Sequence, residues 1–347
     1  MPTWLRGVVD LGPGISEYLR SSYRNIQEVE AARIQEAYDA EDEGGAFEFS
    51  AAWGPGNESR NRYSDIVPYD STRVVLMTPL EPEESDYINA SHVHGLPGTI
   101  PCIFSQGPLP ETIGDFWQMV WEQNSSLIVM LTKEEERGRV KCSRYVPESV
   151  GGTLTCANLG EILIKMESEE SHSNGEVILR RLTISSGGKS RELWQLHFTA
   201  WPDHSASNPA SVLSVIDLSR ELQKQGASAG ATGPVVIHCS AGCGRTGTFC
   251  AIDGVLRLLE KTKSPSDIDE DIIRKTVEKL RESRIAAVQM IEQFAFCYEA
   301  VLYRLLEWQH GIAPGRPDWI AQAPSKLTST SPPDGATPRL GNQGLNG

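Results

Sequence analysis

The sequence predicts one α/β (or α+β) domain in which a central, highly twisted mixed sheet is flanked by helices. Three observations support this fold class: short apolar runs alternate with stretches of helical periodicity, no internal repeat is present, and 347 residues suffice for one large domain. Strands and helices that alternate along one chain pack as a sheet covered by helices.

The first part of the chain is predicted to begin with a helix and to continue into the sheet. Apolar side chains recur at helical spacing over residues 16–40. Strands are expected at 86–93 and 100–106 around a glycine turn, and a helix that begins with a proline is expected at 110–123. Residues 127–131 form a wholly apolar run, which is typical of a central strand.

The second part is predicted to alternate between strands and helices. Further strands are expected at 161–166, 177–185 and 194–199, with an exposed turn at 168–175. A helix over 209–225 is expected to end at Gly226, and three more helices are expected at 245–261, 267–284 and 289–308.

Composition divides the chain into three parts. Residues 1–14 form an N-terminal extension without the apolar core of a signal peptide. Residues 15–310 form the folded domain. Residues 311–347 are rich in Pro, Ser, Gly and Thr, which predicts a disordered tail.

Charge and cysteine content indicate the class of protein. The net charge of −14 argues against partners that are nucleic acids or anionic membranes. The seven cysteines show no paired spacing, which fits a reducing compartment. No apolar run reaches membrane-spanning length. We therefore expect a monomeric cytoplasmic enzyme, with the nucleus as an alternative location, that neither inserts into membranes nor binds nucleic acid.

The segment 235–247 carries the most information about chemistry. An apolar β-branched run ends at His238, and Cys239 follows it. Five small residues then lead to Arg245 and a predicted helix; they are Ser240, Ala241, Gly242, Cys243 and Gly244. Backbone amides and a helix N-terminus favour an anion at this place, and they favour a thiolate over a thiol.

Two further side chains complete this predicted anion site. The guanidinium of Arg245 can bind two phosphate oxygens at once, and the Thr246 hydroxyl can stabilise the Cys239 sulfur as a leaving group. A Cys-x5-Arg spacing alone, without a supporting context, is most simply explained by chance. The preceding strand, the neighbouring His238, the two glycines and the following helix argue against chance here.

The sequence H-C-S-A-G-C-G-R-T-G at 238–247 resembles the signature loop of the cysteine-dependent protein tyrosine phosphatases. The match is close to their phosphotyrosine-specific, non-receptor members. The cysteine at the fourth of the five spacer positions, Cys243, resembles the loop of the PEST-type subgroup. The resemblance extends from about Asn61 to Leu306. It implies a tyrosine-phosphatase-like fold for the catalytic domain at 15–310, phosphotyrosine-containing proteins as partners, and no metal or other cofactor.

Trp201-Pro202-Asp203 resembles the family's mobile acid loop. Asp203 would protonate the tyrosyl oxygen and then act as a base toward water, and Trp201 would anchor the hinge. Without the signature loop, this Pro-Asp could equally be an ordinary surface turn. The flank at 204–207 lacks the family's usual Gly and Pro, so loop closure is expected to differ.

Asn61-Arg62-Tyr63 and Asp65 resemble the family's phosphotyrosine-recognition loop. The Tyr63 ring can form one wall of a pocket for an aryl ring, and the phosphoserine side chain is too short to reach Cys239 at the bottom of this pocket. The Asp65 carboxylate can accept hydrogen bonds from the backbone amides of the substrate. Taken alone, Tyr63 would more simply be a core aromatic side chain.

Three polar residues resemble supporting parts of the family's site. Gln289 resembles the residue that positions the hydrolytic water, with Gln293 secondary, although both could be ordinary polar residues of a helix N-terminus. Glu136 resembles the carboxylate that orients Arg245, although an exposed charge run with Glu134 and Glu135 is an alternative. His238 is expected to support the loop.

These residues predict a two-step hydrolysis of phosphotyrosine through a phosphocysteine, in intracellular signalling. Two alternatives remain open. One is a weakly catalytic module that captures phosphotyrosine proteins. The other is a Cys-x5-Arg enzyme with another substrate, such as a dual-specificity phosphatase, a lipid phosphatase or a sulfur transferase.

Overall fold

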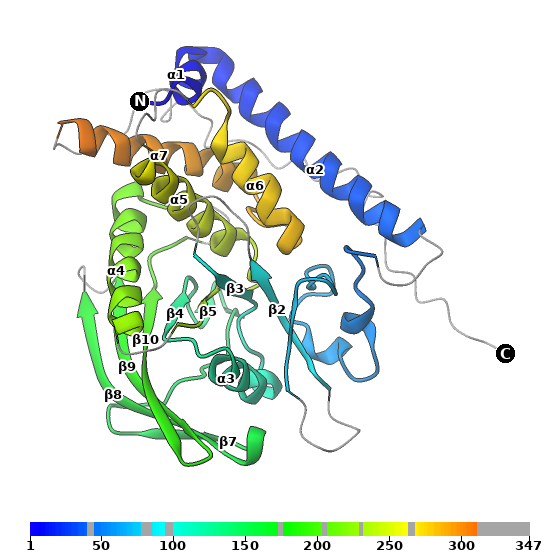
Figure 1. Ribbon diagram of the computed structural model, residues 1–347, viewed down its shortest axis with the longest axis vertical. Coiled ribbons are helices and arrows are strands. Elements are labelled where there is room, and N and C mark those ends of the chain that lie inside the picture. Colours follow the sequence, from blue (N-terminus) through cyan, green and yellow to red (C-terminus); the bar gives the residue numbers. More distant parts are fainter. Residues whose placement is uncertain are drawn as a thin grey trace. The chain divides into compact units, whose positions relative to one another are not determined.

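The computed structural model describes residues 1–39, 45–77, 85–93, 100–172, 176–202, 207–228, 232–262 and 268–310. Within these residues, a nine-stranded mixed sheet runs in the order β1-β2-β3-β11-β4-β10-β9-β8-β7, and β5 and β6 form a separate hairpin (Figure 1). The predicted fold class is therefore confirmed.

The strands are β1 (Arg73–Val75), β2 (Tyr87–Val93), β3 (Cys102–Ser105), β4 (Leu127–Met130), β5 (Glu135–Glu136), β6 (Arg139–Val140), β7 (Thr153–Cys156), β8 (Ile162–His172), β9 (Val177–Ser186), β10 (Lys189–Phe198) and β11 (Val235–His238). The helices are α1 (Thr3–Asp10), α2 (Ile15–Asp39), α3 (Ile113–Glu122), α4 (Pro209–Ser228), α5 (Gly244–Lys261), α6 (Ile272–Ser283) and α7 (Ile291–His310).

The centre of the sheet is parallel. Strand β11 lies between β3 and β4, with Val236 opposite both Ile103 and Ile128. Strand β10 then pairs in parallel with β4. All four residues of β11 are buried, which explains its unbroken apolar sequence, because a central parallel strand is covered on both faces. Its carboxyl end delivers Cys239 to one edge of the sheet.

Helices cover both faces of the sheet. Helix α3 contributes Phe116 and Trp117 to a core cluster with Val236 and Ile128. Helix α4 lies against β4 and β10, α5 against β11, and α6 against β2. Figure 1 shows α5, α6 and α7 grouped together, with the long α2 running along them.

The segment 1–14, which we separated as an N-terminal extension, is packed against the domain. It forms α1, which buries Trp4, Leu5 and Val8, and the Trp4 ring meets Tyr298 of α7 edge-on at 6.3 Å. The segment is therefore part of one compact unit with the sheet. The predicted disordered tail at 311–347 lies outside the described residues.

Several predicted boundaries were wrong. Strand β10 begins at Lys189 and not at 194, and helix α6 begins at Ile272 and not at 267. Strand β8 continues to His172, opposite Val177, through residues predicted to be an exposed turn. A register shift between Met166 and Ser168 interrupts the alternation that would have revealed the strand. Helix α4 continues past Gly226 to Ser228. The glycine is needed there because a Cβ would lie 2.2 Å from the Ser126 hydroxyl oxygen.

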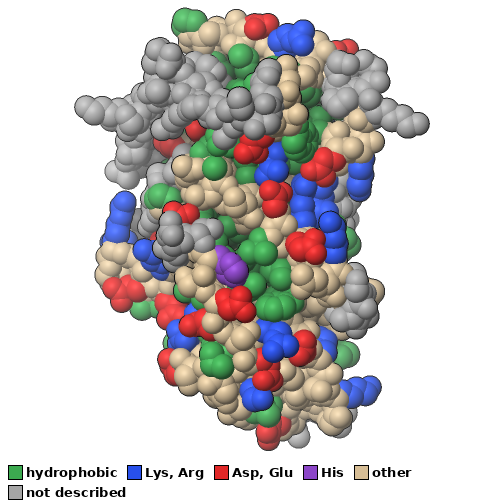
Figure 2. Space-filling model, turned by 90° about the vertical axis from the view of Figure 1, so that its left-hand side faces the viewer, with side chains coloured by type: hydrophobic (Ala, Val, Ile, Leu, Met, Phe, Trp, Pro, Cys, Tyr) green, Lys and Arg blue, Asp and Glu red, His purple; other side chains and the backbone are tan. Residues whose placement is uncertain are grey.

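The described part of the chain has no helix of the length and apolar character needed to span a membrane. On the face shown in Figure 2, acidic and basic side chains lie interspersed with small apolar patches.

Candidate active site

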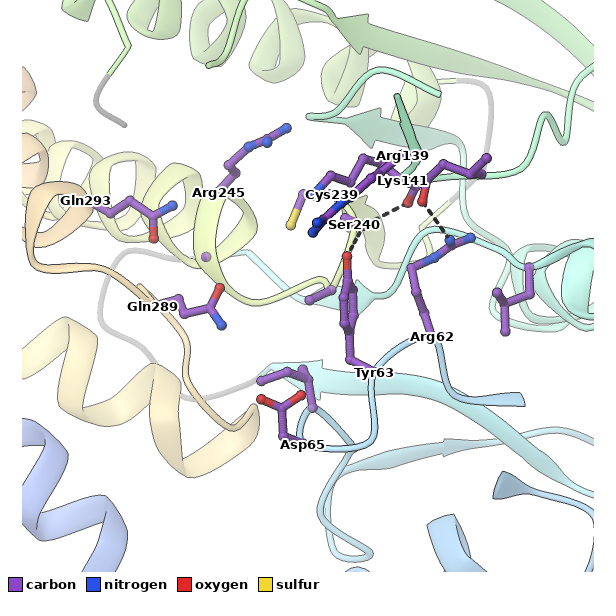
Figure 3. Close-up of a pocket in the computed structure, with 15 residues that line it drawn as sticks. Arg62, Tyr63, Asp65, Arg139, Lys141, Cys239, Ser240, Arg245, Gln289 and Gln293 are labelled. Carbon is purple, nitrogen blue, oxygen red and sulfur yellow. Dashed lines mark hydrogen bonds between the residues drawn. The ribbon is translucent and has the colours of Figure 1, made fainter. Parts of the chain in front are cut away.

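Cys239 lies in the wall of a cavity of about 420 Å³ between the end of β11 and the start of α5 (Figure 3). Cys239 is 5% exposed. The cavity brings together most of the predicted site, namely Tyr63, Asp65, Cys239, Ser240, Ala241, Gly244, Arg245, Gln289 and Gln293. Segments that lie far apart in the sequence therefore converge on one sulfur atom.

The loop after Cys239 turns its carbonyl groups away from the cavity. The Ser240 carbonyl accepts from the Gly107 N–H at 2.8 Å, and the Ala241 carbonyl accepts from the Arg284 guanidinium at 2.9 Å. In a trans peptide the C=O and the following N–H point in opposite directions. The amides of Ala241 and Gly242 therefore point away from Gly107 and Arg284. Ala241 lines the cavity, where its N–H can bind an anion.

The tight turn of the loop depends on Gly242. Its φ is +71°, and a Cβ on it would lie 2.1 Å from the Ser105 carbonyl oxygen. Only glycine fits this position without a shift of the backbone. Gly242 and Cys243 do not themselves line the cavity. Cys243 is fully buried, and burial raises the pKa of its thiol, so its side chain packs behind the loop.

Glu136 of β5 fixes the orientation of Arg245. Nη1 and Nη2 of Arg245 donate to the two carboxylate oxygens at 2.7 Å each. Burial alone raises the pKa of Glu136, but the hydrogen bonds and charge of Arg245 outweigh it, so the pKa is lowered and the carboxylate is ionised. Glu134, which the sequence could not separate from Glu136, pairs with Arg144.

His238 supports the loop as a neutral imidazole. Burial lowers its pKa to about 4. Its Nε2 accepts from the Tyr145 hydroxyl at 2.7 Å, and its Nδ1–H donates to the Cys239 carbonyl at 3.1 Å. Gln195 Nε2 donates to the Tyr145 oxygen at 2.7 Å. Sequence reasoning missed Tyr145 and Gln195, because neither lies in a recognisable motif.

Tyr63 and Ser240 form one wall of the cavity. Ser240 Oγ donates its single proton to the Lys141 carbonyl at 2.9 Å, so the Tyr63 hydroxyl is the donor to Ser240 Oγ at 2.9 Å. Figure 3 shows the Tyr63 ring standing beside the cavity, with Asp65 following on the same loop. Among the described residues, the Asp65 carboxylate has no hydrogen-bond partner, so it can accept from a substrate.

Three further predicted residues, Thr246, Gln289 and Gln293, differ in their hydrogen bonds. The Thr246 hydroxyl is buried and has no hydrogen-bond partner within the described ranges, but Thr246 is not among the residues that line the cavity. The Gln289 amide lines the cavity and likewise makes no hydrogen bond to a described residue. Gln293 Oε1 accepts from the Met290 N–H at 3.2 Å, so part of its function is to cap α7.

The structure describes Trp201, whereas Asp203, the predicted acid, lies outside the described residues. Trp201 is buried, and its ring packs edge-on against Phe198 and Phe296. It also lines a second cavity of about 400 Å³ that includes Glu136. Asp203 and the flank at 204–206 lie outside the described residues.

Comparison with known proteins agrees with this geometry. The family model described as protein-tyrosine phosphatase matches residues 57–303. Human tyrosine-protein phosphatase non-receptor type 18 is 39% identical over 251 residues, covering 71% of this chain and 51% of the relative. Human non-receptor type 12 is 38% identical over 246 residues, covering 71% of this chain and 30% of the relative.

A solved structure described as "PTPN18 in complex with HER2-pY1196 phosphor-peptides" superposes with a TM-score of 0.75 at 34% identity, covering 86% of this chain and 97% of that one. The chain belongs to the protein-tyrosine phosphatase family. Types 18 and 12 also fit the non-receptor, PEST-type resemblance. The chain spans about half the length of the type 18 relative.

Proposed function

We propose that this chain hydrolyses phosphotyrosine in proteins, in intracellular signalling. The observation that carries the proposal is the placement of Cys239 beneath inward-facing amides and the Arg245–Glu136 pair, in a cavity walled by Tyr63. The related phosphatase PTPN18 forms a complex with HER2-pY1196 peptides, which supports the same substrate class.

The first step transfers the phosphoryl group to the enzyme. The Cys239 thiolate forms a bond to phosphorus as the bond to the tyrosyl oxygen breaks, and Asp203 gives its proton to that oxygen. Arg245 and the loop amides stabilise the charge on the remaining phosphate oxygens.

The second step releases phosphate. Water, positioned by Gln289, forms a bond to phosphorus as the sulfur–phosphorus bond breaks. Its proton passes to the Asp203 carboxylate, and Cys239 leaves as a thiolate that Thr246 stabilises. The residues of this chain supply every group in both steps, so we propose that no cofactor is required.

Turnover of a phosphotyrosine peptide tests the proposal. The wild-type chain should release phosphate from it and not from matched phosphothreonine peptides or phosphoinositides. Cys239→Ser should abolish release, and Asp203→Ala should slow it while the substrate stays bound. Full activity of Cys239→Ser would overturn the mechanism. A preference for phosphoinositides would instead favour the lipid phosphatase alternative.

We also propose that the chain acts as a monomer in the cytoplasm or nucleus and binds no nucleic acid. The net charge of −14 supports the last point, because a phosphate backbone would be repelled. Light scattering after size exclusion should give a mass near 38.1 kDa, and a doubled mass would contradict the monomer.

A further inference from the structure

We propose that helix α2 positions Gln289 for the second step, with Glu30 and Tyr23 acting on the backbone of residues 286–289, in part through Arg281. This inference rests on the proposed function. It concerns a helix that ends before the family model begins at residue 57.

Glu30 binds this segment both directly and through a cation. One carboxylate oxygen accepts from the Ala286 N–H at 2.9 Å, and the other accepts from Arg281 Nη1 at 2.9 Å. Both side chains are buried: Glu30 is 8% exposed and Arg281 is 3% exposed. A buried pair of this kind has a defined geometry, because either charge alone would be costly.

Arg281, which Glu30 holds in place, in turn binds the carbonyl groups of the next two residues. Its Nε donates to the Ala287 carbonyl and its Nη2 to the Val288 carbonyl, each at 3.0 Å. The Tyr23 hydroxyl lies 3.2 Å from the Val288 carbonyl and also donates to the Gln289 carbonyl. Three consecutive carbonyls are thus held by side chains that α2 supplies or fixes.

The segment needs such restraint because its backbone is strained. Ala286 and Val288 have φ of 55° and 59°, and a β-branched residue rarely adopts this left-handed region. On its other side, the Val288 N–H donates to the Cys243 carbonyl at 3.2 Å. The residues before Gln289 are therefore clamped between α2 and the loop that carries Cys239.

This arrangement acts on one step only. Gln289 is assigned to placing water, which enters the second step and not the first. Removal of a contact from α2 lets the strained segment relax and displaces the Gln289 side chain. A misplaced water slows attack on the phosphocysteine, while attack by Cys239 keeps its geometry. The phosphocysteine then accumulates during turnover.

Rapid mixing with p-nitrophenyl phosphate separates the two steps. In Tyr23→Phe and Glu30→Gln, we expect an unchanged rate constant for the first release of nitrophenolate. The steady rate should fall about 10-fold, and mass spectrometry of the quenched enzyme should show more phosphocysteine than in wild type. Glu28→Gln, on an exposed acid of the same helix, is the matched control and should behave as wild type.

Three outcomes would overturn the inference. One is an equal slowing of both steps in Tyr23→Phe, which leaves the Glu30–Arg281 pair intact and is the milder change. Another is no change in either variant. The third is a further slowing by Tyr23→Phe when Gln289 is already Ala, because residues that act through Gln289 have no additional effect there. If wild type releases no nitrophenolate at all, the proposed function fails instead.

Discussion

Arg245 and Glu136 are joined by two hydrogen bonds of 2.7 Å, although 109 residues separate them in the sequence. A third bond, from Arg245 Nη1 to the Leu131 carbonyl at 3.0 Å, fixes the same guanidinium to the end of β4. The plane of the guanidinium that we propose to bind phosphate is thus set by the protein before substrate arrives. Such preorganisation is the main source of electrostatic stabilisation in active sites.

Replacement of Glu136 tests this preorganisation. Glu136→Gln should lower kcat/KM for an aryl phosphate about 10- to 100-fold, because the guanidinium loses one charged acceptor and its fixed plane. Glu134→Gln is the matched control, since Glu134 pairs with Arg144 at the surface. Equal losses in the two variants would show that Glu136 has no special role.

Tyr63 should control the choice of substrate. Tyr63→Ala removes the aromatic wall and should raise KM for a phosphotyrosine peptide about 3- to 10-fold, which reduces the preference over phosphoserine. Tyr63→Phe keeps the ring and loses only the hydrogen bond to Ser240, so its effect should be smaller. If Tyr63→Phe is as impaired as Tyr63→Ala, the hydroxyl and not the ring matters.

Two buried histidines should make the fold sensitive to acid. Burial lowers the pKa of His238 and His197 to about 4, from 6.5 in the unfolded chain. Between these values the unfolded state binds protons that the folded state does not, so stability falls as pH falls. The difference corresponds to roughly 3 kcal/mol for each histidine. Urea unfolding at pH 7 and pH 4.5 measures it, and equal midpoints would contradict it.

Gly242→Ala should damage both folding and activity. The new Cβ would lie 2.1 Å from the Ser105 carbonyl oxygen, on a backbone with φ of +71°. Gly151→Ala is the matched control, because its φ is +82° and nothing lies within 4 Å of a Cβ there. The control should cost about 1–2 kcal/mol. Thermal unfolding should show a larger loss for Gly242→Ala, together with loss of turnover.

Arg139 should attract acidic substrates. Its guanidinium lines the cavity and has no ion-pair partner among the described residues. Arg139→Ala should raise KM about two- to five-fold for a peptide with Asp or Glu beside the phosphotyrosine, and the effect should vanish in 1 M salt. Lys189→Ala removes an exposed charge from the start of β10 and is the control. A loss that persists in high salt would exclude an electrostatic origin.

Local pattern was enough to predict the conformation of the loop after Cys239 and most of the sheet. The apolar run before Cys239 and the small residues after it specify a strand, a tight turn and a helix start, all within 13 residues. Tyr63, Asp65 and Gln289 were predicted from family resemblance, and the structure places all three at the cavity. The role of Asp203 stays a prediction.

The residues that were missed act over long sequence distances. Arg284 binds the Ala241 carbonyl and Tyr145 binds His238, but each lies in a segment whose pattern indicates only helix or loop. The β5–β6 hairpin was missed because its turn places Arg137 at φ of 51°, where glycine or asparagine would be the usual signal. Such partners emerge only from packing in three dimensions.

The burial of Arg281 against Glu30 also bears on where the catalytic unit begins. A fragment limited to the family match at 57–303 would retain Cys239 but lose the Glu30 carboxylate and the helix α2 that packs on α6, so the Arg281 guanidinium would lose its ion-pair partner. The folded unit therefore includes α1 and α2 and begins upstream of the sequence pattern by which the family is recognised.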